Sequence, residues 1–179
     1  MVVVGLTGQK CAGKGEIVEV LKRHGWGHIS LSGIVAEELD KEGIEHSREN
    51  LIRRANEMRA KEGPGVLAQR AKERIEQAGG GRWVVESIRH PDEVSILKEF
   101  PDFELWKITS SAEERFARSQ ARGRKENADT LEKFKELEEK ENKKSGDVQR
   151  ISDCEALAEI TITNDDTIES LQKKINEIL

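Results

Sequence analysis

The sequence predicts an α/β fold in which a five-stranded parallel sheet is covered by helices on both faces. Short runs rich in valine and isoleucine alternate along the chain with longer segments whose apolar residues recur at helical spacing. Strands that alternate with helices in this way form parallel sheets, because each helix carries the chain back across the sheet. The 179 residues contain no internal repeat and no low-complexity linker. We therefore expect one domain over residues 1–179.

Five segments have the composition of buried strands, and they account for the predicted sheet. The expected strands cover residues 2–6, 29–31, 82–88, 103–109 and 160–163. The helices expected between and after them cover residues 14–24, 31–42, 48–61, 64–78, 91–100, 112–122, 130–144 and 167–179. Glycine or proline residues mark several of the boundaries.

The composition excludes several classes of function. Charged residues make up 36% of the chain and the net charge is −5, so a basic surface for nucleic acid is not expected. Cys11 and Cys154 are far apart and the four histidines lack metal-ligand spacing, so neither a disulfide scaffold nor a zinc site is expected. The apolar start of the chain is too short for a signal peptide or a membrane helix. We expect a cytoplasmic monomer or homodimer that acts on small molecules, without nucleic-acid or membrane partners.

The strongest motif is a glycine-rich loop between the first strand and the first helix. Residues 8–15 read GQKCAGKG and fit the phosphate-binding pattern GxxxxGK. Glycines allow backbone N–H groups to point at phosphate oxygens, and the helix that follows adds the positive end of its dipole. Lys14 supplies a cation for the β- and γ-phosphates and is the first candidate catalytic residue. The predicted nucleotide contacts are Gly8, Gln9, Lys10, Cys11, Ala12, Gly13, Lys14, Gly15 and Glu16.

Gly15 departs from the usual form of this motif. It occupies the position at which phosphate-binding loops commonly have serine or threonine, and Glu16 follows it. Without a hydroxyl group there, Mg²⁺ lacks its usual direct protein ligand. We therefore expect phosphates and water to hold most of the coordination sphere of the ion.

Together with the loop, motifs along most of the chain resemble the adenylate-kinase branch of P-loop proteins. More closely, the chain resembles dephospho-CoA kinase-like and deoxynucleoside monophosphate kinase-like proteins, and archaeal adenylate-kinase-related proteins. Only the P-loop is specific by itself, and the ordered set is more specific than any member. The other matching segments are HISLS at 28–32, SRENL at 47–51, Arg59, GPGVLA at 63–68, ESIRHPDEV at 86–94, the segment from Arg115 to Arg124, and ITND at 162–165.

The resemblance implies a three-layer P-loop NTPase sandwich that uses ATP and Mg²⁺. It implies a core of about 1–30, 80–110 and 155–179, acceptor-binding helices at about 31–78 and a lid at about 115–150. Ser32, Arg48 and Arg59 would then contact the acceptor. Asn164 would lie at the adenine base, although an ordinary turn explains its position equally well.

Two positions depart from the pattern of these relatives. At these positions the relatives commonly have aspartate and then arginine, whereas this chain has Gly33 and Ala36. In the relatives, that arginine ordinarily binds the phosphate of the acceptor. Either another arginine has taken over its role or the acceptor differs from a standard nucleoside monophosphate; the candidates are Arg48, Arg53, Arg54 and Arg59.

Glu86 and Arg89 are predicted at the ligand crevice, because Glu86 ends a valine-rich strand and the carboxyl ends of parallel strands face that crevice. Glu86 can hold a Mg²⁺-bound water or orient the acceptor hydroxyl, and it stands where the relatives commonly have aspartate. It is therefore the candidate metal residue and a catalytic candidate. Arg89 can bind an acceptor phosphate or pair with Asp92 or Glu93 on the surface.

A cluster of arginines follows the fourth strand. Arg115, Arg118 and Arg122 are spaced i, i+3 and i+7 and share a helix face, and Arg124 follows Gly123, a plausible hinge. Guanidinium groups suit the charge that spreads over a phosphoryl group during transfer. Arg118 and Arg122 are the favoured catalytic candidates, and Arg118 is also expected to contact the bound ATP. Ion pairs with neighbouring glutamates are the alternative.

These patterns predict an ATP-dependent phosphotransferase that moves the γ-phosphate to a small nucleotide acceptor, a nucleoside or deoxynucleoside monophosphate. Dephospho-CoA kinase is the alternative among enzymes, and it needs a carboxylate base such as Glu86 for a ribose hydroxyl. A nucleotide-binding switch with little catalysis is the alternative of another class.

Overall fold

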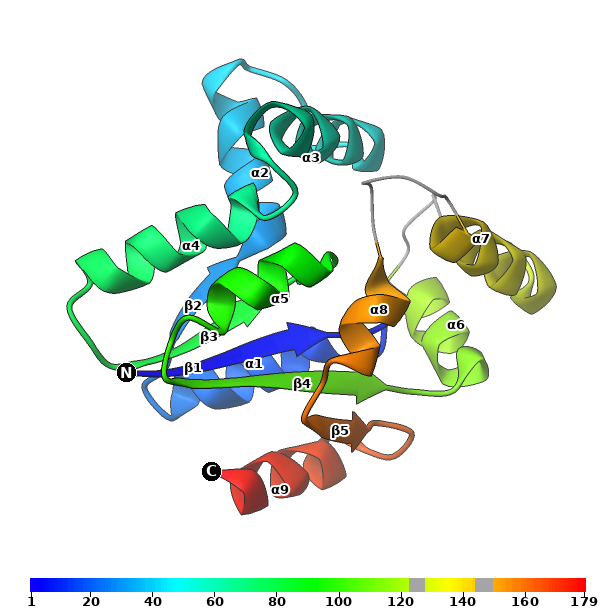
Figure 1. Ribbon diagram of the computed structural model, residues 1–179. Helices are drawn as coiled ribbons and strands as arrows, with labels where there is room; N and C mark the ends of the chain where they lie inside the picture. The colour runs from blue at the N-terminus through cyan, green and yellow to red at the C-terminus, as the bar shows by residue number, and fades with distance from the viewer. Residues whose placement is uncertain (123–127, 144–149) are drawn as a thin grey trace.

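The predicted sheet is present in the computed structural model, which describes residues 1–122, 128–143 and 150–179 (Figure 1). Its five strands are all parallel and lie in the order β2-β3-β1-β4-β5. The strands are β1 (Val2–Thr7), β2 (Gly27–Ser30), β3 (Arg82–Glu86), β4 (Asp102–Thr109) and β5 (Ile160–Thr163). The α/β class, the five strands and their direction are thereby confirmed.

Apolar residues that alternate along the strands point to opposite faces of the sheet and build two separate cores. Val3 packs on one face with helices α2 (Leu31–Lys41), α3 (Arg48–Glu62), α4 (Val66–Gln77), α5 (Pro91–Leu97) and α8 (Ile151–Ala156). Val4 packs on the other face with α1 (Lys14–Arg23) and α9 (Ile168–Ile178). β1 pairs with β3 on one side and β4 on the other, so its carboxyl end lies at the centre of the sheet.

The remaining described helices, α6 (Ala112–Ala121) and α7 (Leu131–Lys143), follow β4 and lie side by side beyond the carboxyl end of the sheet (Figure 1). Phe116 and Phe134 join them through a tilted ring contact with centroids 5.7 Å apart. Gly123 and Arg124, the expected hinge and the last arginine of the cluster, lie outside the described residues, as does part of the expected lid.

The structure differs from the expected elements at several boundaries, including β2, which covers 27–30 instead of 29–31, and α4, which begins at Val66 instead of residue 64. The third strand ends at Glu86 instead of residue 88, because Ser87 has a left-handed backbone with φ of 66° that breaks the extended run. Helix α5 ends at Leu97 instead of Phe100. Helix α8 was not predicted: it has six residues, of which only Cys154 is buried, so it has almost no apolar periodicity.

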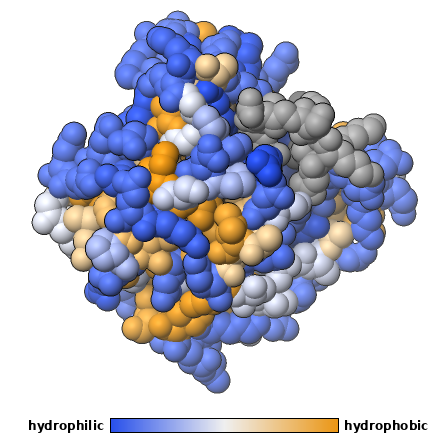
Figure 2. Space-filling model, in the orientation of Figure 1, coloured by the Kyte–Doolittle hydropathy of each residue, from blue (hydrophilic) through white to orange (hydrophobic). Residues whose placement is uncertain are grey.

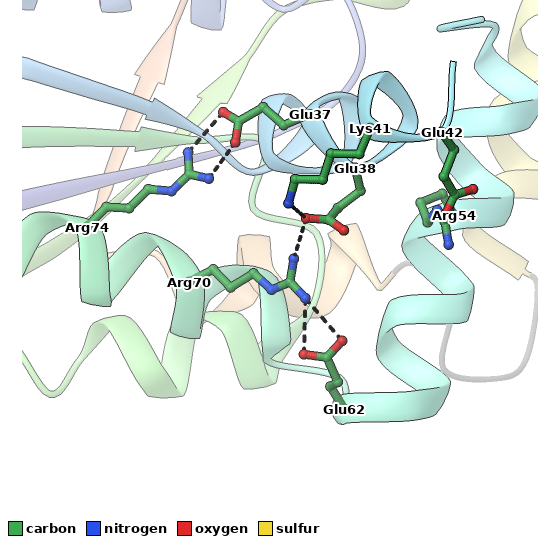
Figure 3. A network of polar contacts seen from close by, with 8 residues as sticks. All are labelled: Glu37, Glu38, Lys41, Glu42, Arg54, Glu62, Arg70 and Arg74. Atoms are coloured by element: carbon green, nitrogen blue, oxygen red, sulfur yellow. Dashed lines mark hydrogen bonds and ion pairs between the residues drawn. The ribbon is translucent and has the colours of Figure 1, made fainter. Parts of the chain in front are cut away.

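The surface is highly charged, as the composition predicts. Most of the face in Figure 2 is hydrophilic, and its hydrophobic residues gather near the middle of the view, around α5 and β4. Ion pairs join the three helices α2, α3 and α4 (Figure 3). Arg70 of α4 donates to Glu38 of α2 at 3.0 Å and to Glu62 of α3 at 3.1 Å. Two further contacts connect the same helices, Arg74 with Glu37 and Arg54 with Glu42.

Arg70→Met should lower the free energy of unfolding by about 1 kcal/mol, because one guanidinium group bridges two helices and the methionine retains its apolar stem. The loss should shrink in high salt, which screens half-exposed charges. Arg53→Met is the control, since Arg53 makes an exposed pair with Glu57 within α3; there we expect only a few tenths of a kcal/mol. Equal effects from chemical denaturation of the two variants would contradict a special role for the bridge.

Candidate active site

The glycine-rich loop joins β1 to α1 at the centre of the sheet, and its neighbours fix its shape. Gly8 has φ of 130°, and a Cβ atom there would lie 2.1 Å from the carbonyl oxygen of Ile108. Gly13 has φ of 106°, and a Cβ atom there would lie 2.1 Å from Nδ2 of Asn164. Both positions therefore require glycine for conformation and for space. The loop is thus tightly packed from behind, while α1 starts directly after it.

Lys14 folds back over this loop. Its Nζ donates to the carbonyl oxygens of Gly8 at 2.6 Å and Gln9 at 2.9 Å. Burial lowers the pKa of Lys14 to about 8, and the nearby positive charge of Arg89 adds to this effect. The ammonium group is therefore held where its charge is unfavourable, and an anion beside it would relieve that cost.

Asn164 fastens the loop to the end of β5. Its side chain is buried and donates from Nδ2 to the carbonyl oxygen of Ala12 at 2.9 Å. Its backbone oxygen accepts from Arg118 at 2.8 Å. The structure thus places Asn164 behind the loop and joins it to the arginine cluster.

Two of the cluster's arginines make contacts within the protein. Arg115 is buried and donates to the carbonyl oxygens of Ser110 at 3.0 Å and Lys10 at 3.4 Å, and it also pairs with Glu138 of α7. Arg118 donates to the hydroxyl of Ser110 at 3.2 Å in addition to Asn164. Arg122 ends α6 as an exposed C-cap residue. Arg115 and Arg118 therefore position the loop, and Arg122 is the exposed member.

Glu86 lies at the carboxyl end of β3, in register with Ser30 at the end of β2. Its Oε1 is 3.5 Å from Nε2 of His28, an ion-pair distance when the imidazole is protonated. His28 is the largest cause that lowers the pKa of Glu86, and Ser30 and Lys14 contribute to the same direction. Glu86 is therefore ionised at neutral pH and close enough to Lys14 to influence it.

A chain of hydroxyl groups lies beside Glu86. The Oγ atom of Ser32 is 3.0 Å from that of Ser30 and 3.2 Å from that of Ser87. Ser87 holds its hydroxyl there from a left-handed conformation, which costs a non-glycine residue about 1–2 kcal/mol. Ser32 is thus connected to the strand ends that also hold Glu86.

Three further arginines converge on the turn after β3. Arg89 belongs to that turn, and burial lowers its pKa. Arg59, which is buried on α3, and Arg48, at the start of the same helix, lower the pKa of Arg89 further through their positive charges. The predicted acceptor residues Arg48 and Arg59 are therefore close enough to Arg89 for their charges to act on it.

The site offers few direct ligands for a metal ion. Within the described residues, no group of three or more histidine, cysteine or acidic side chains could hold one. Thr7 at the end of β1 is buried and donates its hydroxyl to the carbonyl oxygen of Ile88. Glu86, which is close enough to Lys14 for their charges to interact, could hold a water of a Mg²⁺ ion whose other ligands were phosphates and water.

Sequence reasoning missed three features of this site. Glu93, which contacts both Arg59 and the turn of Arg89, was assigned only to a surface pair. His28 lies in a segment that matches the resembled families, but the sequence indicates no role for this side chain. Helix α8 reaches the site through the backbone N–H of Arg150, which donates to the carbonyl oxygen of Arg89 at 2.7 Å. Pro91 followed two residues later by Glu93 is a first-turn capping pattern that could have revealed the glutamate.

Comparisons with known proteins find relatives that match over nearly the whole chain. A UPF0200 protein of Methanothermobacter thermautotrophicus is 30% identical over 180 residues, covering 100% of this chain and 90% of its own. A UPF0200 protein of Pyrococcus abyssi is 30% identical over 184 residues, covering 99% of this chain and 95% of its own. No protein-family model matches the chain.

Solved structures show the same architecture at low identity. The shikimate kinase of Acinetobacter baumannii has a TM-score of 0.61 at 13% identity, covering 99% of this chain and 92% of its own. A gluconokinase from Sinorhizobium meliloti has a TM-score of 0.51 at 10% identity, covering 97% of this chain and 89% of its own. The fold is therefore that of P-loop kinases.

No described helix is long and apolar enough to cross a bilayer.

Proposed function

The chain belongs to the UPF0200 family, and we propose that it is an ATP-dependent phosphotransferase of the adenylate-kinase-like branch whose acceptor is a small nucleotide. One observation carries the proposal: a phosphate-binding loop with a buried lysine lies next to a second group of cations. Arg89 and Glu86 both influence the pKa of Lys14, so the two groups lie near each other at the carboxyl ends of the strands. Two adjoining cationic sites suit two phosphate-bearing ligands.

Each residue has a role in this proposal. The loop of residues 8–15 holds the β- and γ-phosphates, and Lys14 neutralises the charge that develops on the transferring group. Glu86 would hold Mg²⁺ through a water molecule, and the ion would supply positive charge to the phosphates. Arg118 keeps the loop in place through Asn164, and Arg122 is the exposed cation available for the transferring phosphoryl group.

A phosphate acceptor makes a smaller chemical demand on Glu86 than a ribose hydroxyl does. A hydroxyl acceptor must lose its proton as the new bond forms, and an effective general base has a pKa near the working pH. The pKa of Glu86 is instead lowered from its ordinary value, chiefly by His28. A monophosphate oxygen is already ionised near neutral pH and needs no such base. This supports a nucleoside or deoxynucleoside monophosphate over dephospho-CoA.

The test is ADP release from ATP and Mg²⁺ across a panel of ribonucleoside monophosphates, deoxynucleoside monophosphates and dephospho-CoA. We expect a nucleoside or deoxynucleoside monophosphate to raise turnover far above the rate with ATP alone. Stimulation by dephospho-CoA only would move the assignment to the alternative kinase. Tight ATP binding without stimulation by any acceptor would favour a nucleotide-binding switch.

Gly15→Thr should lower the Mg²⁺ concentration needed for half-maximal rate by about threefold to tenfold, equivalent to roughly 1 kcal/mol. A Cβ atom at Gly15 would meet nothing within 4 Å, so a side chain fits, and its hydroxyl would supply the missing Mg²⁺ ligand. Gly15→Ala is the control, because it adds a Cβ atom without a hydroxyl. If both variants shift the Mg²⁺ titration equally, the hydroxyl argument is wrong.

A further inference from the structure

Glu93 joins the two parts of the acceptor side. It lies in the first turn of α5 and is fully buried. Its Oε1 atom accepts from Nη2 of Arg59 on α3 at 2.9 Å. Its Oε2 atom accepts from the backbone N–H groups of Arg89 at 2.8 Å and His90 at 3.1 Å. One carboxylate therefore fixes a guanidinium group and the turn that carries a second one.

Helix capping explains only part of this arrangement. In a capping box, the third residue of a helix reaches back to the backbone N–H of the N-cap residue, which here is His90. Capping requires neither the contact with Arg59, 34 residues earlier in the chain, nor that with Arg89. A buried ion pair adds little net stability, because both charges lose their hydration. The contact with Arg59 therefore calls for a role beyond stability.

Arg59 still has donors to offer. Its side chain is 3% exposed, and its Nε and Nη1 atoms are buried without a hydrogen-bond partner among the described residues. Buried N–H groups of a charged side chain are costly when left unsatisfied. Arg89 lies close enough for its pKa to fall in the field of Arg59. An anion that accepts from Arg59 would therefore satisfy its free donors and offset the repulsion between the two arginines.

We propose that Glu93 is a positioning residue that presents Arg59 and Arg89 as a preformed subsite for one anionic group of the acceptor. The group is a phosphate or carboxylate, which accepts from planar guanidinium groups in two-pronged geometry. Arg59 on α3 thereby takes the role that the resemblance gives to an arginine at the position of Ala36 on α2. This inference rests on the proposed function only because that proposal assigns the region around Arg59 and Arg89 to the acceptor.

The test is calorimetric binding of AMP and of inorganic phosphate to protein saturated with a non-hydrolysable ATP analogue. Glu93→Gln should weaken AMP binding by about tenfold or more, because the charge that orients Arg59 is lost. Affinity for the ATP analogue should stay within about twofold, a split that general destabilisation would not produce. Phosphate should bind weakly to the wild type and lose affinity in the same variant.

The matched control is Glu159→Gln. Glu159 also pairs with a cation, Lys98 at 3.0 Å, and accepts a backbone N–H, that of Leu105 at 2.8 Å, but it lies between α8 and β5. AMP affinity should be unchanged there. A double variant provides a second measurement: Glu93→Gln added to Arg59→Met should weaken AMP binding no further than Arg59→Met alone, because Glu93 acts through Arg59.

Three results would overturn the inference: unchanged AMP affinity in folded Glu93→Gln, equal losses in Glu93→Gln and Glu159→Gln, or wild-type protein that binds neither probe. If Glu93→Gln does not fold, Arg59→Met decides, since unchanged AMP affinity in that variant would refute the subsite. Binding that depends on Glu93 without any phosphoryl transfer would contradict the proposed function alone.

Discussion

Lys14→Ala is expected to reduce phosphoryl transfer by at least about 10³-fold, the largest effect of any single substitution in the chain. Among the described residues, the ammonium group donates to carbonyl oxygens of its own loop and no carboxylate lies within ion-pair distance of it, so its removal breaks no ion pair there. Alanine is also a good helix former at this position. Rates would be measured with the best acceptor, and circular dichroism would confirm the fold. The control is Lys22→Ala, an exposed lysine of the same helix that pairs with Glu19.

The pH dependence of nucleotide binding provides an independent check on Lys14. Its pKa is lowered to about 8 in the free protein, whereas the phosphates of a bound nucleotide favour the charged form and raise that pKa. Above pH 8 the free protein must take up a proton to bind, so affinity should fall with rising pH, by at most about tenfold per unit. Lys14→Ala should remove this dependence. Near-normal turnover or an unchanged pH profile in that folded variant would refute the role of the loop in catalysis.

Glu86→Gln should have the second largest effect, and its response to Mg²⁺ separates the two classes of acceptor. If the acceptor is a phosphate oxygen, Glu86 acts by holding the water of the Mg²⁺ ion. The variant should then lose rate at limiting Mg²⁺ and recover most of it in excess Mg²⁺. If the acceptor is a ribose hydroxyl, the variant should lose about 10²–10⁴-fold in rate, and Mg²⁺ should not restore it.

We expect the first outcome, because a phosphate acceptor needs no general base and Glu86, which is ionised at neutral pH, can hold a Mg²⁺-bound water. The measurement is a Mg²⁺ titration of kcat with the best acceptor. Glu104→Gln is the control: it is an exposed carboxylate on β4, which β1 separates from β3, and it accepts from Nε1 of Trp106 at 3.0 Å. A Glu86→Gln enzyme with full rate at limiting Mg²⁺ would exclude both roles for this carboxylate.

The sheet and the loop could be predicted from sequence because local rules determine both. Val2–Thr7 is a continuous apolar run with a strand on each side, and Gly8 and Gly13 occupy backbone conformations that only glycine adopts readily. The position of Glu86 followed in the same way, because a parallel sheet collects the carboxyl ends of its strands at one edge.

Contacts between distant segments could not be predicted in this way. Asn164 and Ala12 are 152 residues apart, and Arg59 and Glu93 are 34 apart, so neither pair leaves a periodic signal. Helix α8 is short and contributes one buried side chain, which gives hydrophobic periodicity nothing to detect. The spacing of Arg115 and Arg118 predicted a shared helix face, but the choice between protein contacts and ligand contacts depends on partners from other elements.

The most direct test of the central claim is phosphorus NMR of a reaction that contains the protein, ATP, Mg²⁺ and the best acceptor of the panel. We predict that the signals of ATP and of the acceptor monophosphate decline together while nucleoside diphosphate signals grow, with two diphosphates formed for each ATP consumed. Lys14→Ala should show neither. If ATP is consumed and inorganic phosphate accumulates while the acceptor signal stays unchanged, the chain hydrolyses ATP without transfer, and the assignment as a phosphotransferase is wrong.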